Sequence, residues 1–213
     1  NDPLGLVRAA DEIAHDLQTD PSARSLYEYG TLPGVVNLNK LGALPIRNYT
    51  TNVTDADMTQ WEAPKLREGF DHRGHQCNSC GMHHCHMSVS RQGAYKGKIV
   101  DEPEYEGWSG AGWTIGVTKD KDGVAWLNTQ LDRACLDVNE FGWLCGFVME
   151  CQERGLITER QLGFRLAWGD TEGANRLLQM LSRREGLGDL LAEGTKLAAE
   201  RLGVLHVHRH RRH

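Results

Sequence analysis

The chain has 213 residues, with 24 Lys or Arg against 29 Asp or Glu and a formal net charge of −5. This length suffices for one large or two small domains with a buried core. The acidic balance argues against a nucleic-acid or anionic-membrane partner, and no apolar run approaches the roughly 20 residues that cross a bilayer. The acidic N-terminal segment is no signal peptide. We therefore expect a cytoplasmic protein whose six cysteines are metal ligands or core thiols rather than disulfides.

The N-terminal third predicts helices followed by loops. Asp2 is placed to cap a helix that has Pro3 in its first turn, and apolar residues then recur at helical spacing. A second helix is predicted over 22–29. Residues 30–76 mix Gly, Pro, Asn and Thr with short apolar runs, which predicts loops and short helices. Farther along, Lys alternates with less polar residues, which predicts a strand over 94–100.

From residue 122 onward the apolar pattern is helical. Asp137 is placed to cap a helix, with Glu140 as its capping-box partner and an end near Gly155. The other helices are predicted over 122–135, 171–184 and, as a single last helix, from Leu190 to Leu202.

These elements predict a mainly α fold. We expect one helical region over 1–203, with a first part of about 1–120 that carries a cysteine loop and a second part of about 121–203. The His- and Arg-rich tail over 204–213 is expected to lie outside the fold.

The cysteine loop is the clearest chemical signal in the chain. Cys77, Cys80 and Cys85 lie within nine residues, in HQCNSCGMHHCHM. Three thiols on a polar loop suit a soft metal or an iron–sulfur cluster, which needs four soft ligands. The alternative is a zinc site with a histidine as the fourth ligand, and the spacing does not separate the two. The candidate histidines are His72, His75, His83, His84 and His86.

The motif EPEYE places three carboxylates at alternating positions, Glu102, Glu104 and Glu106. In an extended segment all three would share one face. Repulsion between the like charges would raise the pKa of one carboxyl, which could then exchange protons near neutral pH. The alternative is a solvated acidic strand edge.

The motif DRACLD places Asp132 and Asp137 on either side of Cys135. A carboxylate can accept two hydrogen bonds from a planar N–C–N donor such as a pterin edge. The alternative is a helix cap at Asp137 with Asp132 in solvent. The remaining thiols, Cys145 and Cys151, fall on a predicted helix and are expected to be core residues.

In this order, the motifs of the chain resemble the tungsten-dependent aldehyde ferredoxin oxidoreductase family over nearly all of residues 1–203. The matching blocks are LGALPIRNY, the C-x2-C-x4-C loop, EPEYEG, DRACLD, ERGLITERQLG and SRREGLGDLLAEGTKLAAERLG. The resemblance favours a 4Fe–4S cluster over zinc. It implies helical domains that follow an N-terminal β-rich domain, with tungsten held between the domains by two pyranopterins; molybdenum is not distinguished from tungsten.

The resemblance also implies roles for individual residues. These are cluster ligands at Cys77, Cys80 and Cys85, pterin contacts at Asp132 and Asp137, and a proton acceptor at Glu104 or Glu106. The implied reaction oxidises an aldehyde and passes electrons through the cluster to ferredoxin or other electron-transfer subunits. The stretches EGWSGAGW and CLDVNEFGW are more similar to the branch that contains the catalytic subunit of ATP-independent benzoyl-CoA reductase, which implies an aromatic thioester substrate instead.

The chain departs from the family pattern in three respects. Four residues rather than three separate Cys80 from Cys85, and Cys135 stands where the family has Gly. The family's fourth cluster cysteine, its second pterin motif and its N-terminal domain have no counterpart in the sequence. We therefore expect a chain that is incomplete at both ends and inactive alone, whose oligomeric state is open. The non-enzymatic alternative is a zinc-stabilised helical interaction module.

Overall fold

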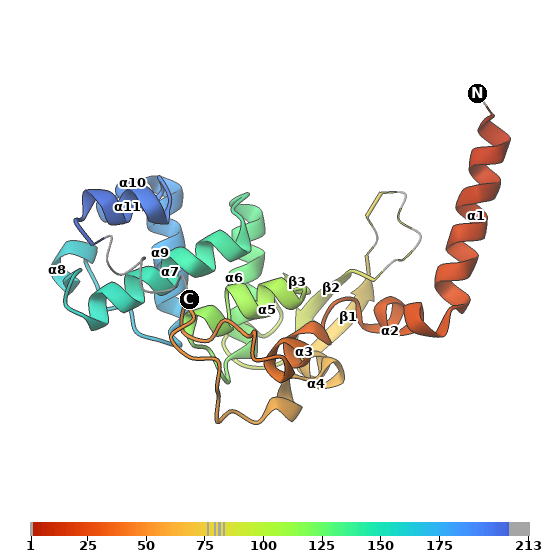
Figure 1. Ribbon diagram of the computed structural model, residues 1–213, viewed down its shortest axis with the longest axis horizontal. Helices are drawn as coiled ribbons and strands as arrows, with labels where there is room; N and C mark the ends of the chain where they lie inside the picture. The colour runs from red at the N-terminus through yellow and green to blue at the C-terminus, as the bar shows by residue number, and fades with distance from the viewer. Residues whose placement is uncertain (1, 76, 79, 81, 83, 205–213) are drawn as a thin grey trace.

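The computed structural model describes residues 2–75, 77, 78, 80, 82 and 84–204. Helices make up most of these residues, and one antiparallel sheet lies between the N-terminal helices and the helical body (Figure 1). The prediction of a mainly α fold is therefore confirmed. Among the described residues, no helix combines the length and apolar character that crossing a membrane requires.

The N-terminal elements are helices and the three strands of the sheet. In chain order they are α1 (Pro3–Thr19), α2 (Pro21–Tyr29), α3 (Gly34–Lys40), η1 (Met58–Trp61), α4 (Ala63–Arg67), β1 (Phe70–Gly74), β2 (His86–Ser90) and β3 (Ile99–Asp101).

The C-terminal elements form the helical body. They are α5 (Tyr105–Gly110), η2 (Trp113–Ile115), α6 (Lys121–Arg133), α7 (Val138–Glu153), α8 (Glu159–Leu162), α9 (Thr171–Arg183), α10 (Leu187–Leu191) and α11 (Thr195–Arg201).

The first helix forms as predicted. The Asp2 carboxylate accepts a hydrogen bond from the Gly5 backbone N–H, and Pro3 occupies the first turn. Apolar side chains of α1 remain open to solvent, with Leu6 73% and Ile13 61% exposed. Helices α1 and α2 form an arm that extends away from the body (Figure 1).

The sheet has the order β1-β2-β3, and both pairings are antiparallel. Pairing of β1 with β2 runs from Phe70 opposite Ser90 to Gly74 opposite His86. The predicted strand over 94–100 is wrong for most of its length, because β3 begins only at Ile99. The preceding residues form turns in which Gly93 and Gly97 have φ of 66° and 80°, a conformation that disfavours an extended strand.

The core is one buried cluster with members from Leu32 to Val204. Its centre holds Trp61, whose ring centroid lies 6.0 Å from that of Trp108 and 4.7 Å from that of Trp113. Because this core includes residues on both sides of position 120, the division near that position stays a prediction. The predicted tail starts at Val204, which is buried, and its other residues lie outside the described part of the chain.

The helical body follows the predicted pattern except at its end. The Asp137 carboxylate caps α7 by accepting a hydrogen bond of 2.7 Å from the Glu140 N–H, and the Glu140 carboxylate accepts one from Thr195. The single last helix that was predicted is wrong, because two shorter helices, α10 and α11, occupy that segment. Gly194 separates them with φ of 93°, which interrupts a right-handed helix.

Candidate metal centre

The three loop cysteines lie between β1 and β2, on the connection of a hairpin (Figure 1). The ladder continues one step into the loop, where the His75 N–H donates to the Cys85 carbonyl at 2.9 Å. The Cys80 N–H donates to the Cys77 carbonyl at 3.1 Å and closes a turn. Cys77 is exposed, whereas Cys80 and Cys85 are half-buried, and all three are free thiols. Of the candidate histidines, His83 lies outside the described residues.

The Cys85 thiol contacts an imidazole and a carboxylate. Its Sγ lies 3.6 Å from His84 Nδ1 and 3.9 Å from Glu104 Oε1. Burial first, then the Cys77 thiol and the negative charge of Glu104, raise the pKa of Cys85 to about 12. Without a bound cation this cysteine is therefore a neutral thiol at pH 7, and a nearby cation would favour its thiolate form.

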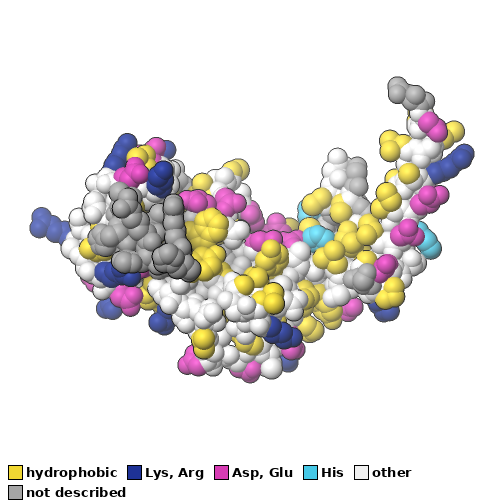
Figure 2. Space-filling view, viewed as in Figure 1, with side chains coloured by type: hydrophobic (Ala, Val, Ile, Leu, Met, Phe, Trp, Pro, Cys, Tyr) yellow, Lys and Arg dark blue, Asp and Glu magenta, His cyan; other side chains and the backbone are white. Residues whose placement is uncertain are grey.

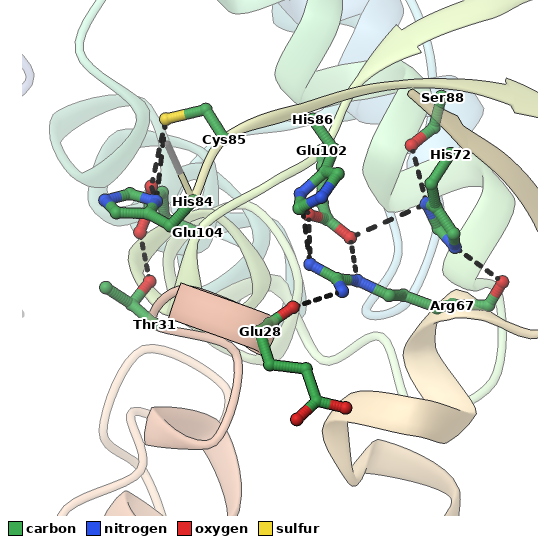
Figure 3. Close-up of polar contacts among 10 residues, drawn as sticks. All are labelled: Glu28, Thr31, Arg67, His72, His84, Cys85, His86, Ser88, Glu102 and Glu104. Carbon is green, nitrogen blue, oxygen red and sulfur yellow. Dashed lines mark hydrogen bonds and ion pairs between the residues drawn. The ribbon is translucent and has the colours of Figure 1, made fainter. Parts of the chain in front are cut away.

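The Glu104 carboxylate is held from the opposite side by the turn after α2. The Thr31 hydroxyl donates to Glu104 Oε2 (Figure 3). The Thr31 oxygen also accepts a 3.0 Å hydrogen bond from the Tyr105 N–H. The other carboxylate oxygen lies 3.3 Å from His84 Nδ1. Thr31 was not singled out in the sequence, because it lies 73 residues from Glu104 in a segment with no metal-binding or catalytic pattern.

A second polar cluster surrounds Glu102. Arg67 donates to both Glu102 oxygens, at 2.7 and 2.9 Å, and its Nη1 donates to the Glu28 carbonyl at 2.6 Å (Figure 3). His86 Nδ1 lies 2.9 Å from the same carboxylate. The Arg67 and Glu102 side chains are only 14% and 10% exposed. This two-pronged pair is therefore a largely buried ion pair that ties the sheet to α2 and α4.

His72 belongs to the same cluster. Its Nδ1 lies 3.0 Å from Ser88 Oγ, and its Nε2 lies 3.1 Å from the Arg67 carbonyl. Burial, the largest influence, lowers the pKa of His72, so the neutral ring is favoured at pH 7. In this structure His72 and His86 take part in the Glu102 cluster, whereas His84 lies beside the Cys85 thiol.

The expectation that Glu102, Glu104 and Glu106 share one face is wrong. Glu102 faces Arg67 and Glu104 faces Cys85, but α5 begins at Tyr105 and places Glu106 in its first turn. There Glu106 accepts a hydrogen bond from the Tyr105 side chain, which is the main cause that raises the pKa of Tyr105. Helical backbone replaces the alternation of an extended strand at this point.

The DRACLD segment forms the turn between α6 and α7. The Leu136 N–H donates to the Leu131 carbonyl at 3.1 Å, and the Cys135 N–H donates to the Asp132 carbonyl at 3.0 Å. These two bonds define a Schellman motif, whose left-handed residue is most often Gly. Cys135 occupies that position with φ of 55°. The glycine-like backbone is therefore kept although the side chain is not.

Asp132 and Asp137 are both exposed on this turn. Asp137 caps α7, as the alternative interpretation expected. Loss of water contact and the charge of Asp101 raise the pKa of Asp132. The pKa of Asp101 is also raised, mainly by burial, while the charge of His75 lowers it. Asp101 therefore lies within electrostatic range of Asp132 in the turn and of His75 in the hairpin. Acidic side chains and histidines line the hollow between the body and the hairpin (Figure 2).

Comparison with known proteins identifies relatives over most of this sequence. The family described as "Aldehyde ferredoxin oxidoreductase, domains 2 & 3" matches residues 8–211. A tungsten-containing aldehyde ferredoxin oxidoreductase of Pyrococcus furiosus is 30% identical over 198 residues, which is 90% of this chain and 31% of that protein. Its counterpart in Thermococcus kodakarensis is 31% identical with the same coverage. The chain thus spans about a third of the length of these relatives.

Two further matches differ from those enzymes. The "Aliphatic sulfonate oxidoreductase, WOR-like subunit" of Pyrococcus furiosus is 36% identical over 126 residues, which is 59% of this chain and 20% of that protein. The active site complex BamBC of benzoyl coenzyme A reductase, solved with 1,5-dienoyl-CoA, superposes with a TM-score of 0.65 at 16% identity. The superposition covers 96% of this chain and 32% of that one, and at this identity it shows a shared fold.

Proposed function

Because this chain belongs to the aldehyde ferredoxin oxidoreductase family, we propose that it is the part of a tungsten-pterin, iron–sulfur oxidoreductase that contacts the cluster and one pterin. The observation that carries the proposal is the hairpin that presents Cys77, Cys80 and Cys85 on one partly exposed loop. Free thiols on a loop at a protein surface fit the ligand set of an iron–sulfur cluster.

Three of the four cluster ligands would come from this loop. The remaining described thiols fit that role poorly. Cys145 and Cys151 are buried within α7, and burial raises the pKa of both, that of Cys151 to about 12. Cys135 is held in the turn that ends α6. We therefore propose that the fourth ligand comes from outside these 213 residues, and that the chain alone is inactive.

The exposed carboxylates of Asp132 and Asp137 would accept hydrogen bonds from the N–H groups of a pterin edge. The Schellman motif supports this role because it fixes the backbone of both residues relative to α6 and α7. Asp137 uses one oxygen, Oδ1, as the helix cap.

When bound, a tungsten pterin supplies two-electron chemistry and the cluster passes single electrons onward. The residues of this chain would orient the cofactors and move a proton. We assign the proton acceptor to Glu104 rather than Glu106. Glu104 lies beside the cysteine loop with its carboxylate positioned by Thr31, whereas Glu106 accepts a hydrogen bond from Tyr105.

The proposed substrate is an aldehyde, and the proposed electron partner is ferredoxin or an electron-transfer subunit. The tungsten-containing relatives, which match 90% of this chain, favour this choice. The shared fold with the benzoyl coenzyme A reductase complex keeps reduction of an aromatic thioester as the second candidate. A reducing cytoplasm is the expected compartment, because cluster thiols must stay reduced.

Metal analysis of the intact parent protein tests the proposal. Anaerobically purified protein should contain iron, inorganic sulfide and tungsten or molybdenum, and Cys80→Ser should lose iron and sulfide. The matched variant Cys145→Ser should keep them, because that thiol is buried in α7. A parent protein with neither iron nor tungsten or molybdenum would contradict the proposal.

A further inference from the structure

A cavity lies in the helical body, at a distance from the cysteine hairpin. It has a volume of about 420 Å³ and lies between α7, the end of α9, and α10 (Figure 1). Pockets that bind small molecules commonly measure about 300–1,000 Å³ and have mostly apolar walls. The apolar side chains of this wall are Ala134, Leu136, Phe141, Leu144, Leu181 and Leu191. Its size and lining are therefore those of a small-molecule site.

The cation of the wall, Arg184, is already paired. Its guanidinium donates to Asp189 at 3.0 Å and to Glu193 at 2.7 Å. An anion that entered the cavity would have to compete with these two carboxylates for the same charge. The wall therefore does not favour an anionic ligand.

Two further polar side chains of the wall have partners within the protein. The Ser182 hydroxyl donates to the Leu178 carbonyl at 2.9 Å, and the Glu140 carboxylate accepts a hydrogen bond from Thr195. Transfer of a polar or charged group to apolar surroundings is costly unless it finds a partner. A ligand with few polar groups and no charge therefore fits this cavity best.

The cavity borders the turn between α6 and α7. Asp137 belongs both to this turn and to the cavity wall, whereas Asp132 lies outside the lining. Asp137 Oδ1 caps α7, so Oδ2 of the same carboxylate is left to accept from a ligand. A group held by both aspartates would therefore adjoin the cavity without filling it.

On the premise of the proposed function, we propose that this cavity binds the uncharged alkyl or aryl group of the substrate. Such a group would remove apolar surface from water against Phe141 and Leu144, which are buried, and Leu136, which is 38% exposed. Binding of the part of a substrate that does not react helps to orient the part that does. The cavity thus favours aldehydes with a long or aromatic apolar group over short or charged ones.

The first experiment titrates the 213-residue chain with 1-hexanol, which has the alkyl chain of hexanal without its reactive carbonyl. Changes in NMR chemical shifts measure binding, and we expect one saturable site. Ethanol should bind about a hundredfold more weakly, because four buried methylenes are lost. Hexanoate should bind at least about tenfold more weakly, because its charge finds no free partner.

Variants locate the binding in the cavity. Ala192→Phe places a ring at the exposed edge of the wall and should weaken hexanol binding at least about tenfold. The matched Ala94→Phe adds the same ring to an exposed loop outside the cavity and should bind hexanol as the unaltered chain does. Circular dichroism confirms folding, and Ser182→Phe is the second filling variant where Ala192→Phe does not fold.

The second experiment uses the intact parent protein, in which hexanol should also bind. During aldehyde oxidation, Ala192→Phe should raise the KM for hexanal at least about tenfold and change the KM for acetaldehyde less than about twofold. An increase for an aromatic thioester instead would identify the apolar group as its ring. Equal changes for hexanal and acetaldehyde would contradict the assignment to the substrate.

Three binding results would overturn the inference. The first is the absence of saturable hexanol binding to the unaltered chain, and the second is unchanged binding in both filling variants. The third is tighter binding of hexanoate that Arg184→Gln removes, which would make the cavity an anion site. Binding by the chain but not by the parent protein would also contradict it, because another part of the parent would then fill the cavity.

The proposed function is tested separately. It requires iron, inorganic sulfide and tungsten or molybdenum in the parent protein, none of which hexanol binding needs. A parent protein without these elements that still binds hexanol would contradict the proposed function and leave the cavity an apolar ligand site.

Discussion

The two segments that carry predicted site residues are stabilised in different ways. The cysteine hairpin depends on side chains from distant parts of the chain, such as Arg67 with Glu102 and Thr31 with Glu104. The turn between α6 and α7 depends on local backbone hydrogen bonds around Cys135. Side-chain substitutions should therefore disturb the hairpin strongly, whereas the turn should respond mainly to backbone preference.

The largest expected effect is at the buried ion pair. Glu102→Gln removes the charge that faces Arg67 and should lower the free energy of unfolding by about 3–5 kcal/mol, because a buried charge loses its partner. Urea denaturation at pH 7 measures this change. Glu104→Gln is the matched control, since no arginine or lysine pairs with that carboxylate among the described ion pairs. Equal losses in the two variants would contradict the comparison.

The double variant Arg67→Met, Glu102→Leu sharpens this test. Removing both charges avoids the cost of an unpaired ion, so it should be more stable than Glu102→Gln by about 1–3 kcal/mol. The same denaturation experiment gives the value. A double variant that is less stable than Glu102→Gln would show that the surrounding hydrogen bonds to His86 and Glu28 outweigh the charge pair.

In the turn, Cys135→Gly should stabilise the protein by about 1 kcal/mol, because glycine adopts the left-handed conformation of residue 135 with little strain. Thermal and urea unfolding measure the gain. Cys135→Ala is the control, since it removes the thiol but keeps the Cβ. A comparable gain in both variants would show that the thiol, not the backbone, is the cause.

The smallest effect concerns pH. Burial lowers the pKa of His72 in the folded state, so below the unfolded value near 6.5 the unfolded chain binds a proton that the folded chain does not. Stability should therefore fall as pH drops below about 6.5 and be level in this respect above it. Unfolding measured between pH 5 and 8 tests the slope, and His72→Gln should flatten it. An unchanged slope in His72→Gln would assign the dependence to another group.

Local signals predicted the helices well. Asp2 and Pro3 mark the start of α1, and Asp137 marks the start of α7. Where glycine changes the backbone, periodicity was insufficient: Gly194 divides the last helix, and turns at Gly93 and Gly97 replace most of the predicted strand.

The site was only partly predictable for a related reason. The cysteines stand out by their spacing, but the partners of the glutamates do not, because Arg67 precedes Glu102 by 35 residues and Thr31 precedes Glu104 by 73. Nothing local in the sequence indicates such pairs. An acidic residue such as Glu106 is typical of the first turn of a helix, and that signal indicates why Glu106 leaves the common face.

The arm formed by α1 and α2 joins the rest of the molecule where the candidate metal ligands are held. Glu28, near the end of α2, accepts from Arg67, and Thr31, two residues after α2 ends, donates to Glu104. A displacement of the Glu104 carboxylate would therefore shift the backbone near Thr31, where the arm joins the body. A fluorescent probe attached near Leu4, at the start of α1, would thus report a change in the position of the Glu104 carboxylate.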